Sequence, residues 1–180
     1  MLLLGGEAEK ARGRRLVLRH ALAPLVADAQ VVLRDGAVRP RRLLHEGRGH
    51  AAGPGQAARL FRLAAEQKHA HAQCYLGICY WKGEGVPQDQ AEAARLFRLA
   101  AEQKHADAQC CLGICYTRGD GVPQDQAAAA RLYRLAAEQK HAGAQFSLGV
   151  CYETGAGVPQ DPAEAARLYR LAAEQKHAGA

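Results

Sequence analysis

The sequence has few aromatic side chains and no long apolar run. Aromatic residues make up 6% of its 180 residues, with one Trp and one Met. No apolar stretch approaches the roughly 20 residues that a transmembrane helix requires. Alanine supplies much of the hydrophobic content, and small side chains allow helices to pack closely. The composition therefore excludes a membrane-spanning helix and argues against one globular core filled by large side chains.

Groupings of residues that are typical of enzymes are also missing. The sequence contains no recognisable Ser/His/Asp arrangement, pair of carboxylates or phosphate-binding loop. Glycine pairs such as Gly119 and Gly121 lack the third glycine of the GxGxxG motif. They also follow a predicted helix, whereas that motif follows a strand. We therefore predict a non-enzymatic protein that has no cofactor and no metal site.

The positive charge of the chain lies mostly in its N-terminal part. The formal net charge is +6. Residues 1–56 contain 10 Lys or Arg and 5 Asp or Glu, whereas residues 57–180 contain 14 and 13. A nearly neutral surface argues against binding of a phosphate backbone by residues 57–180. Nucleic-acid binding through the basic N-terminal segment is the less favoured alternative.

The first 33 residues match nothing downstream and form a non-repeat basic segment. Residues 16–23 and 25–33 are apolar enough for two helices separated by Pro24. The same composition also fits a disordered segment or a wrongly assigned gene start. The Arg-rich residues 10–19 resemble an organelle transit peptide, but five acidic residues before position 50 weaken that interpretation.

Residues 34–52 are interpreted as a degenerate half-repeat. Gly47 and Gly49 fall on Gly83 and Gly85 when the sequence is shifted by 36 residues. Pro40 would stop a helix from running through that point. The segment therefore keeps the turn of a repeat and loses most of its first helix.

From residue 53 onward the sequence repeats with a period of 36 residues. The stretch AARLFRLAAEQKHA begins at Ala93, and copies begin at Ala57, Ala129 and Ala165 with only a Phe-to-Tyr change. A fixed period of about 20–50 residues is typical of stacked supersecondary units. Residues 53–180 are therefore predicted to form three full units and a terminal helix.

Each unit is predicted to contain two helices. In the middle unit, Ala108, Leu112 and Cys115 recur at helical spacing over residues 106–118, which we call the A helix. Two glycines and a proline then end this helix and turn the chain. Asp125 is suited to cap the second, or B, helix. The B helix covers about residues 90–104 in its second copy, with a wide apolar face.

Two further details concern the ends and the packing of these helices. Asp89 and Asp161 are followed three residues later by Glu92 and Glu164, which is the spacing of a capping box. Gly113 inside the A helix costs about 1 kcal/mol relative to Ala. Its presence indicates close approach of a neighbouring helix.

The unit closely resembles the Sel1-like repeat, a relative of the tetratricopeptide repeat. The residues that carry the resemblance recur at 108–137 and 144–173; in the first unit they are Ala72, Leu76, Gly77, Tyr80, Gly83, Gly85, Val86, Pro87, Asp89, Ala94, Phe97, Ala100 and Ala101. The resemblance implies an all-α, right-handed α-solenoid whose A helices line the concave side. It also implies an adaptor or scaffold that binds other proteins.

One position departs from the family pattern. The family usually has Gly where this chain has Lys68, Lys104, Lys140 and Lys176. If that position requires a positive φ, Lys costs on the order of 1 kcal/mol there. We therefore expect the chain to enter the A helix with a different shape.

The six cysteines are expected to be reduced. Cys79, Cys115 and Cys151 are equivalent, and equivalent helices lie at least about 8–10 Å apart. That exceeds the about 7 Å between Cα atoms that a disulfide tolerates. Some bacterial cysteine-rich relatives bridge the two helices of a unit, but the B helix has no Cys here. Cys111 and Cys115 lack a second pair of metal ligands, and reduced thiols favour a cytoplasmic or nuclear location.

A histidine follows each B helix, at positions 69, 105, 141 and 177. A polar residue there can meet the last carbonyl groups and the helix dipole. We predict this structural role because equivalent residues of successive units lie too far apart to share one metal ion.

The units differ mainly in their A helices. Six positions vary, namely 71, 74, 75, 78, 81 and 82 with their equivalents, and we expect this stripe to face outward. Exposed aromatic residues are typical anchors of protein interfaces. The candidate partner-binding residues are therefore His71, Tyr75, Trp81, Lys82, Asp107, Arg118, Phe146 and Glu153.

The favoured function is a scaffold or adaptor that binds a peptide or a partner domain on the A-helix surface. Neutral drift on an exposed face explains the same variation about equally well. A self-assembling structural repeat, or a piece of a longer array, is the main alternative. The terminal helix, residues 162–176, has no following A helix to cover it, and an uncapped solenoid exposes an apolar face.

Overall fold

The computed structural model describes residues 54–177. Residues 1–53 and 178–180, and with them the predictions for residues 1–33 and 34–52, lie outside this part. The described residues form seven α-helices and no strand. The helices are α3 (Pro54–Glu66), α4 (Ala70–Lys82), α5 (Gln90–Glu102), α6 (Ala106–Arg118), α7 (Gln126–Glu138), α8 (Ala142–Thr154) and α9 (Pro162–His177).

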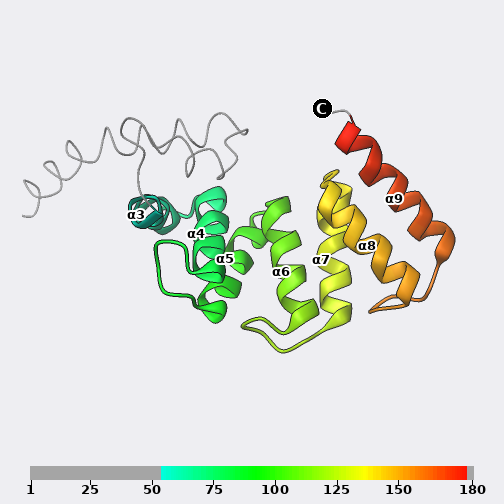
Figure 1. Ribbon diagram of the computed structural model, residues 1–180, viewed down its shortest axis with the longest axis horizontal. Helices are drawn as coiled ribbons and strands as arrows, with labels where there is room; N and C mark the ends of the chain where they lie inside the picture. The colour runs from blue at the N-terminus through cyan, green and yellow to red at the C-terminus, as the bar shows by residue number, and fades with distance from the viewer. Residues whose placement is uncertain (1–53, 178–180) are drawn as a thin grey trace, which may run out of the picture.

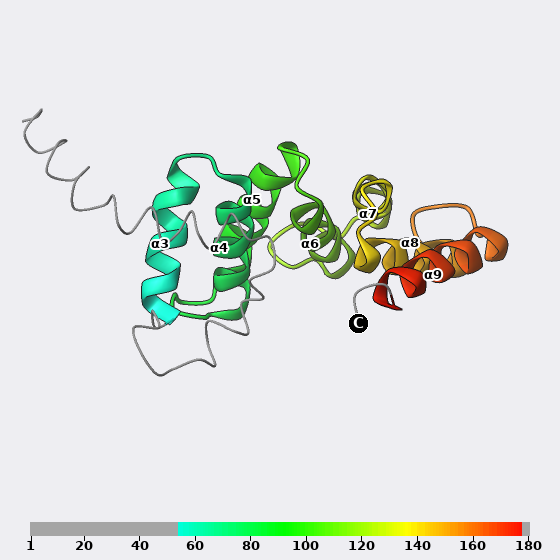
Figure 2. The ribbon, with the colours of Figure 1, turned by 90° about the horizontal axis from the view of Figure 1, so that it is seen from above.

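The helices are arranged in chain order, from α3 at one end to α9 at the other (Figure 1 and Figure 2). Each helix packs against the helices that precede and follow it. The A helices are α4, α6 and α8, and the B helices are α3, α5, α7 and α9. The prediction of an all-α solenoid built from helix pairs is confirmed.

The A helices end at a left-handed glycine, and a second glycine holds the following loop against the preceding unit. Gly119 has φ 81° and Gly121 has φ 70°. A Cβ atom on Gly121 would overlap the carbonyl oxygen of Gln90, at the start of α5. Only glycine satisfies both the backbone angle and this contact. The second glycine therefore fixes the spacing of neighbouring units.

Aspartates begin the B helices α5, α7 and α9, as predicted. The Asp125 Oδ1 atom accepts a hydrogen bond of 2.9 Å from the backbone N–H of Ala128. Asp89 caps α5 in the same way, but the predicted capping box is wrong, because the backbone N–H of Asp89 already donates to the Tyr80 carbonyl (2.9 Å). Glu92 instead pairs with Arg95 at 2.6 Å, and Glu164 pairs with Arg167.

The turn from each B helix to the next A helix keeps the glycine-like backbone despite its lysine. Lys68, Lys104 and Lys140 have φ values of 63°, 62° and 62°. The expected difference in shape is therefore wrong, and each lysine carries a strain of roughly 1–2 kcal/mol. In α9 the same sequence, Glu-Gln-Lys-His, continues as helix to His177.

Two of the histidines after the B helices, His105 and His141, cap the following A helices, whereas His69 makes no side-chain cap hydrogen bond. The Nδ1 atom of His105 accepts from the backbone N–H of Ala108 (3.3 Å), and His141 accepts from Ala144 (3.0 Å). The predicted contact of the side chain with the end of the B helix is therefore wrong. An imidazole acceptor at a helix N-terminus satisfies one of the N–H groups that have no partner within the helix.

Aromatic rings of the B helices cover the glycines of the A helices. A Cβ on Gly113 would lie 2.6 Å from the Tyr133 ring, and one on Gly77 would lie 2.7 Å from the Phe97 ring. Phe97 has no exposed surface. The predicted close approach at Gly113 is confirmed, and the approaching residue is an aromatic side chain.

A ladder of glutamines crosses this otherwise apolar core. Gln73, Gln109 and Gln145 are 3–4% exposed. The side chain of Gln109 donates to the Ala101 carbonyl on α5 (3.4 Å) and accepts from Gln139 after α7 (2.7 Å). Each buried amide thereby joins two successive B helices, which satisfies its polar atoms.

Candidate partner-binding surface

The variable positions of the A helices lie largely at contacts between neighbouring units. We call the contact of α4 with α6 the first seam and that of α6 with α8 the second seam. In the first seam, Nε2 of His105 lies 3.0 Å from Nδ1 of His71. In the second seam, Nε2 of His141 lies 2.9 Å from Oδ1 of Asp107. The candidates His71 and Asp107 therefore each contact the N-cap of the next A helix.

The variable stripe does not face solvent along its whole length. Cys74 and Cys110 are only 2% and 7% exposed. Each A helix contacts two B helices and also its A-helix neighbours, so the side that faces the next unit is covered. The predicted outward orientation is therefore wrong for these positions. The exposed candidates are His71, Lys82, Asp107, Arg118, Phe146 and Glu153, whereas Tyr75 and Trp81 are half-buried.

Trp81 joins the C-terminal ends of α4 and α6. Its indole N–H donates to Oδ2 of Asp120 at 3.3 Å. The Arg118 guanidinium carbon lies 5.8 Å from the centre of the Trp81 ring, within the range of a cation–π contact. Two candidates from different units, Trp81 and Arg118, are thus brought together. Lys82 follows Trp81 in the sequence, and its Nζ lies 3.6 Å from Oε1 of Glu84.

The residue type at position 81 and at its equivalents, 117 and 153, varies together with the aromatic residue on the B helix of the same unit. Thr117 lies 3.1 Å from the hydroxyl of Tyr133. Glu153 accepts from the hydroxyl of Tyr169 at 2.6 Å. The equivalent ring of the first unit is Phe97, which has no hydroxyl, and there the position is Trp81. Part of the variation on the A helices therefore compensates for the change between Phe and Tyr on the B helices.

The other two aromatic candidates occupy opposite ends of the array. Tyr75 stacks on Phe61 of α3, with ring centres 5.3 Å apart. Phe146 lies 5.3 Å from Tyr169 of α9 but is still 58% exposed, and Val150 on the same helix is 37% exposed. The equivalents of Phe146 are Cys74 and Cys110, which the next unit covers. The described part of the chain therefore leaves this face of α8 open.

The two seams differ in their electrostatics. The hydrogen bond with Asp107 raises the pKa of His141, and the same bond lowers the pKa of Asp107. Burial, followed by the charge of His71, lowers the pKa of His105. The bond with Asp107 favours the protonated His141 ring, whereas the cap, in which Nδ1 accepts from Ala144, favours the neutral ring. The two contacts of His141 therefore have opposite pH dependences.

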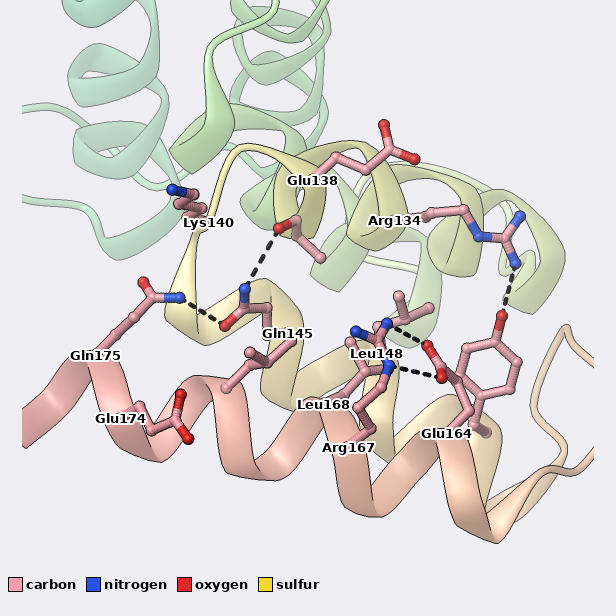
Figure 3. A pocket seen from close by; sticks show the side chains of 13 residues that line it. Arg134, Glu138, Lys140, Gln145, Leu148, Glu164, Arg167, Leu168, Glu174 and Gln175 are labelled. Carbon is pink, nitrogen blue, oxygen red and sulfur yellow. Dashed lines mark hydrogen bonds and ion pairs between the residues drawn. The ribbon is translucent and has the colours of Figure 1, made fainter.

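The B-helix side carries a groove that the sequence did not reveal. A groove of about 680 Å³ lies between α7, α8 and α9, over the buried Leu148 and Leu168 (Figure 3). The equivalent groove between α3, α4 and α5 has a volume of about 330 Å³. Three cations and three carboxylates line the larger groove: Arg134, Lys140, Arg167, Glu138, Glu164 and Glu174. Their balance gives the groove no preference for a charged ligand.

The glutamine ladder is also visible in this groove, where Gln175 donates to Gln145 (2.7 Å) (Figure 3). The signal for it in the sequence is the Gln that recurs in every A helix together with the Gln that recurs at the end of the B helices. Within residues 54–177, no group of three or more His, Cys, Asp or Glu side chains is placed to hold a metal ion. The six cysteines are unpaired. No helix of the described part is both long and apolar enough to cross a membrane.

Comparison with known proteins places these features in context. The Sel1 repeat model matches residues 37–69, 70–105, 106–141 and 142–177. A crystal structure of a Sel1 repeat protein from Oxalobacter formigenes is 36% identical with a TM-score of 0.63, over 68% of this chain and 51% of that one. The c5321 protein, a protective antigen of uropathogenic Escherichia coli strains that displays an SLR fold, is 37% identical with a TM-score of 0.69, over 82% and 33%.

The chain thus spans about half the length of the first of these structures and a third of the second. No curated protein matches it.

Proposed function

The chain belongs to the Sel1 repeat family, whose members generally serve as scaffolds for protein interactions, and we propose that it binds a peptide segment of a partner protein across its A helices. The family is typically non-enzymatic, and the proposal assigns no catalytic residue. The partner lies against the C-terminal ends of α4 and α6.

One observation carries this proposal, namely the contact of Trp81 with Arg118, with Lys82 next to Trp81 in the sequence. The half-buried indole of Trp81 lies beside the Arg118 guanidinium, and both cations are exposed. Trp and Arg are the residue types that most often dominate binding energy at protein interfaces. A peptide that carries a carboxylate next to an aromatic or aliphatic side chain fits this combination of charge and apolar surface.

A random peptide library selected on the wild-type chain provides the test. Selected peptides are expected to bind the double variant Lys82→Ala with Arg118→Ala at least about ten-fold more weakly, which corresponds to about 1.4 kcal/mol. The matched control is Arg134→Ala, which removes an exposed cation from the groove on the B-helix side. Far-UV circular dichroism checks that both variants keep their helices.

The outcomes separate the two surfaces. Equal affinity of the double variant and the wild type contradicts the proposal. Weakening by Arg134→Ala alone places the peptide in the groove instead, and it also contradicts the assignment to the A helices.

Self-association is the second candidate function, and the open face of α8 favours it. Phe146 and Val150 are exposed there, whereas the next unit covers the equivalent positions of α4 and α6. A second copy that packs its own α8 face against this one would bury both residues. The exposed apolar surface expected on the terminal helix thus lies mainly on its neighbour α8, because Ala165, Leu168 and Ala172 of α9 are buried.

Analytical ultracentrifugation over a wide concentration range tests this candidate. A dimer that Phe146→Asp dissociates, and that Leu135→Asp leaves intact, supports it. Leu135 is a suitable control because it is 47% exposed on α7. A monomer at every concentration contradicts self-association.

A further inference from the structure

The middle of the first seam contains two cysteines from different units. Cys74 on α4 is 2% exposed, and Cys111 on α6 is half-buried at the edge of the same apolar cluster. The contact of His71 with His105 and the contact of Trp81 with Asp120 lie on either side of them along the helices. These contacts hold α4 and α6 together at both ends of the seam, with the two thiols between them.

The environment makes the two thiols chemically unequal. The interaction between the two thiols lowers the pKa of Cys111 and raises that of Cys74. Burial of Cys111, and after it the carboxylate of Asp107, oppose the first effect but do not cancel it. The thiolate is the nucleophilic form of cysteine, so Cys111 is the reactive member. Its partial exposure makes it accessible to a small oxidant.

Other cysteines of the A helices lack these properties. Cys115 is 1% exposed, and burial raises its pKa to about 12. Burial also raises the pKa of Cys79 and of Cys151. A protonated, buried thiol is a poor nucleophile. Reactivity is therefore expected to concentrate at Cys111.

We propose that Cys74 and Cys111 are an oxidation site, at which a hydroperoxide converts the two thiols into a disulfide that links the first and second units. The Cys111 thiolate attacks the peroxide oxygen, the O–O bond breaks, and the leaving oxygen takes a proton and departs as water or an alcohol. Cys111 is then a sulfenic acid. The Cys74 sulfur attacks the Cys111 sulfur, and the S–O bond breaks. Hydroxide leaves and takes the Cys74 proton to form water. The two thiols lose two electrons in total, and the hydroperoxide gains them.

The second seam supplies a matched comparison within the same molecule. Its equivalents of Cys74 and Cys111 are Cys110 and Ser147. The same backbone arrangement there holds one thiol and one hydroxyl, so no disulfide can form. The site is therefore specific to the first seam, and a single substitution, Ser147→Cys, is expected to create a second one.

Intact-protein and peptide mass spectrometry after treatment with hydrogen peroxide test the proposal. The wild type is expected to lose two hydrogen atoms and to yield a linked pair of tryptic peptides, residues 69–82 and 105–118, joined through Cys74 and Cys111. The link is expected to be absent in Cys111→Ser. In the oxidised wild type, dithiothreitol is expected to reduce the link to two thiols. In Ser147→Cys a second link is expected, which joins Cys110 to the thiol introduced at position 147, within the tryptic peptide of residues 141–167.

Thermal unfolding gives an independent readout. Oxidation is expected to raise the Tm of the wild type and to leave that of Cys111→Ser unchanged, because a cross-link restricts the unfolded chain. Circular dichroism before treatment confirms that the reduced variants are folded. Three results overturn the proposal. They are a wild-type mass that peroxide leaves unchanged, oxidation of Cys111 to a sulfinic acid without the link, and a link that still forms in Cys111→Ser.

Discussion

The first and second seams share one backbone arrangement but differ in the chemistry of their contacts. At the start of the helices, a histidine pair in the first seam corresponds to a carboxylate and a histidine in the second. In the middle, two thiols correspond to a thiol and a hydroxyl. At the end, the indole of Trp81 donates to Asp120 across the first seam, whereas Thr117 bonds within its own unit, to Gly113 and Tyr133.

This comparison changes the meaning of the variation among units. A position that differs between repeats is easily interpreted as part of a recognition surface. Here several such positions instead contact the next unit or the aromatic ring of their own unit. Recognition is therefore better sought among variable residues that are also exposed, of which Lys82 and Arg118 are the clearest.

The largest effect is expected from substituting the second glycine of the turn, which fixes the spacing of neighbouring units. Gly121→Ala is expected to lower the free energy of unfolding by about 3 kcal/mol, because it adds a clash with the Gln90 carbonyl to an unfavourable φ. Gly119→Ala has only the unfavourable φ, since its nearest atoms lie at 3.6 Å, so about 1–2 kcal/mol is expected. Urea denaturation measures both, and equal losses would show that the contact between units contributes nothing.

An intermediate effect is expected from exchanging the chemistry of two units. Phe97→Tyr places a hydroxyl against Trp81 without an acceptor such as Thr117, at a cost of about 1–3 kcal/mol. Adding Trp81→Thr supplies that acceptor and is expected to recover about 1 kcal/mol of coupling in a double-mutant cycle. Urea denaturation of the wild type, the two single variants and the double variant measures this coupling. Strictly additive losses would argue against compensation within the unit.

The smallest effect is expected from pH, with opposite signs in the two seams. His105 has a lowered pKa, so its contribution to stability is full above the unfolded value of about 6.5 and declines as pH falls through it. His141 has a raised pKa, so its contribution is full below about 6.5 and is lost as pH rises through the folded value. Because the pKa of Asp107 is lowered, its contact with His141 in the second seam persists in acid until the carboxylate is protonated.

The variant His71→Asp gives the first seam the chemistry of the second. It is expected to be more stable than the wild type at pH 5.5, by less than about 1 kcal/mol because position 71 is exposed, and to lose that advantage at pH 8. Urea denaturation at both pH values gives the comparison, and Lys82→Ala serves as a control away from the histidines. An identical pH dependence of His71→Asp and the wild type would remove the assigned difference between the seams.

Most of the local structure could be predicted from the sequence, since it depends on neighbours along the chain. The predicted A helix, residues 106–118, agrees with α6, and the aspartate caps and the crowding at Gly113 followed from residue type and spacing. Errors arose where a distant partner decides the outcome. The backbone N–H of Asp89 is taken by Tyr80, so Glu92 turns to Arg95.

Dependence on residues distant in the sequence also explains which features of the candidate surface were not predicted. The burial of Cys74 depends on α6, and the capping role of His105 depends on a helix that begins after it. The groove between α7, α8 and α9 requires the spacing of three helices. A periodic sequence identifies residues that occupy equivalent places, but it does not identify the neighbours that these places bring into contact.

The two conformations of the Glu-Gln-Lys-His stretch have a consequence for how the array folds. After α5 and α7 this stretch turns at a left-handed lysine, whereas in α9, with no A helix behind it in the described residues, it stays helical. A left-handed lysine is unfavourable by itself, so the docking of the next A helix must stabilise the turn. Each B helix therefore finishes folding only when its successor arrives, and this is nearest-neighbour cooperativity of the kind that makes a solenoid fold as a propagating chain of units.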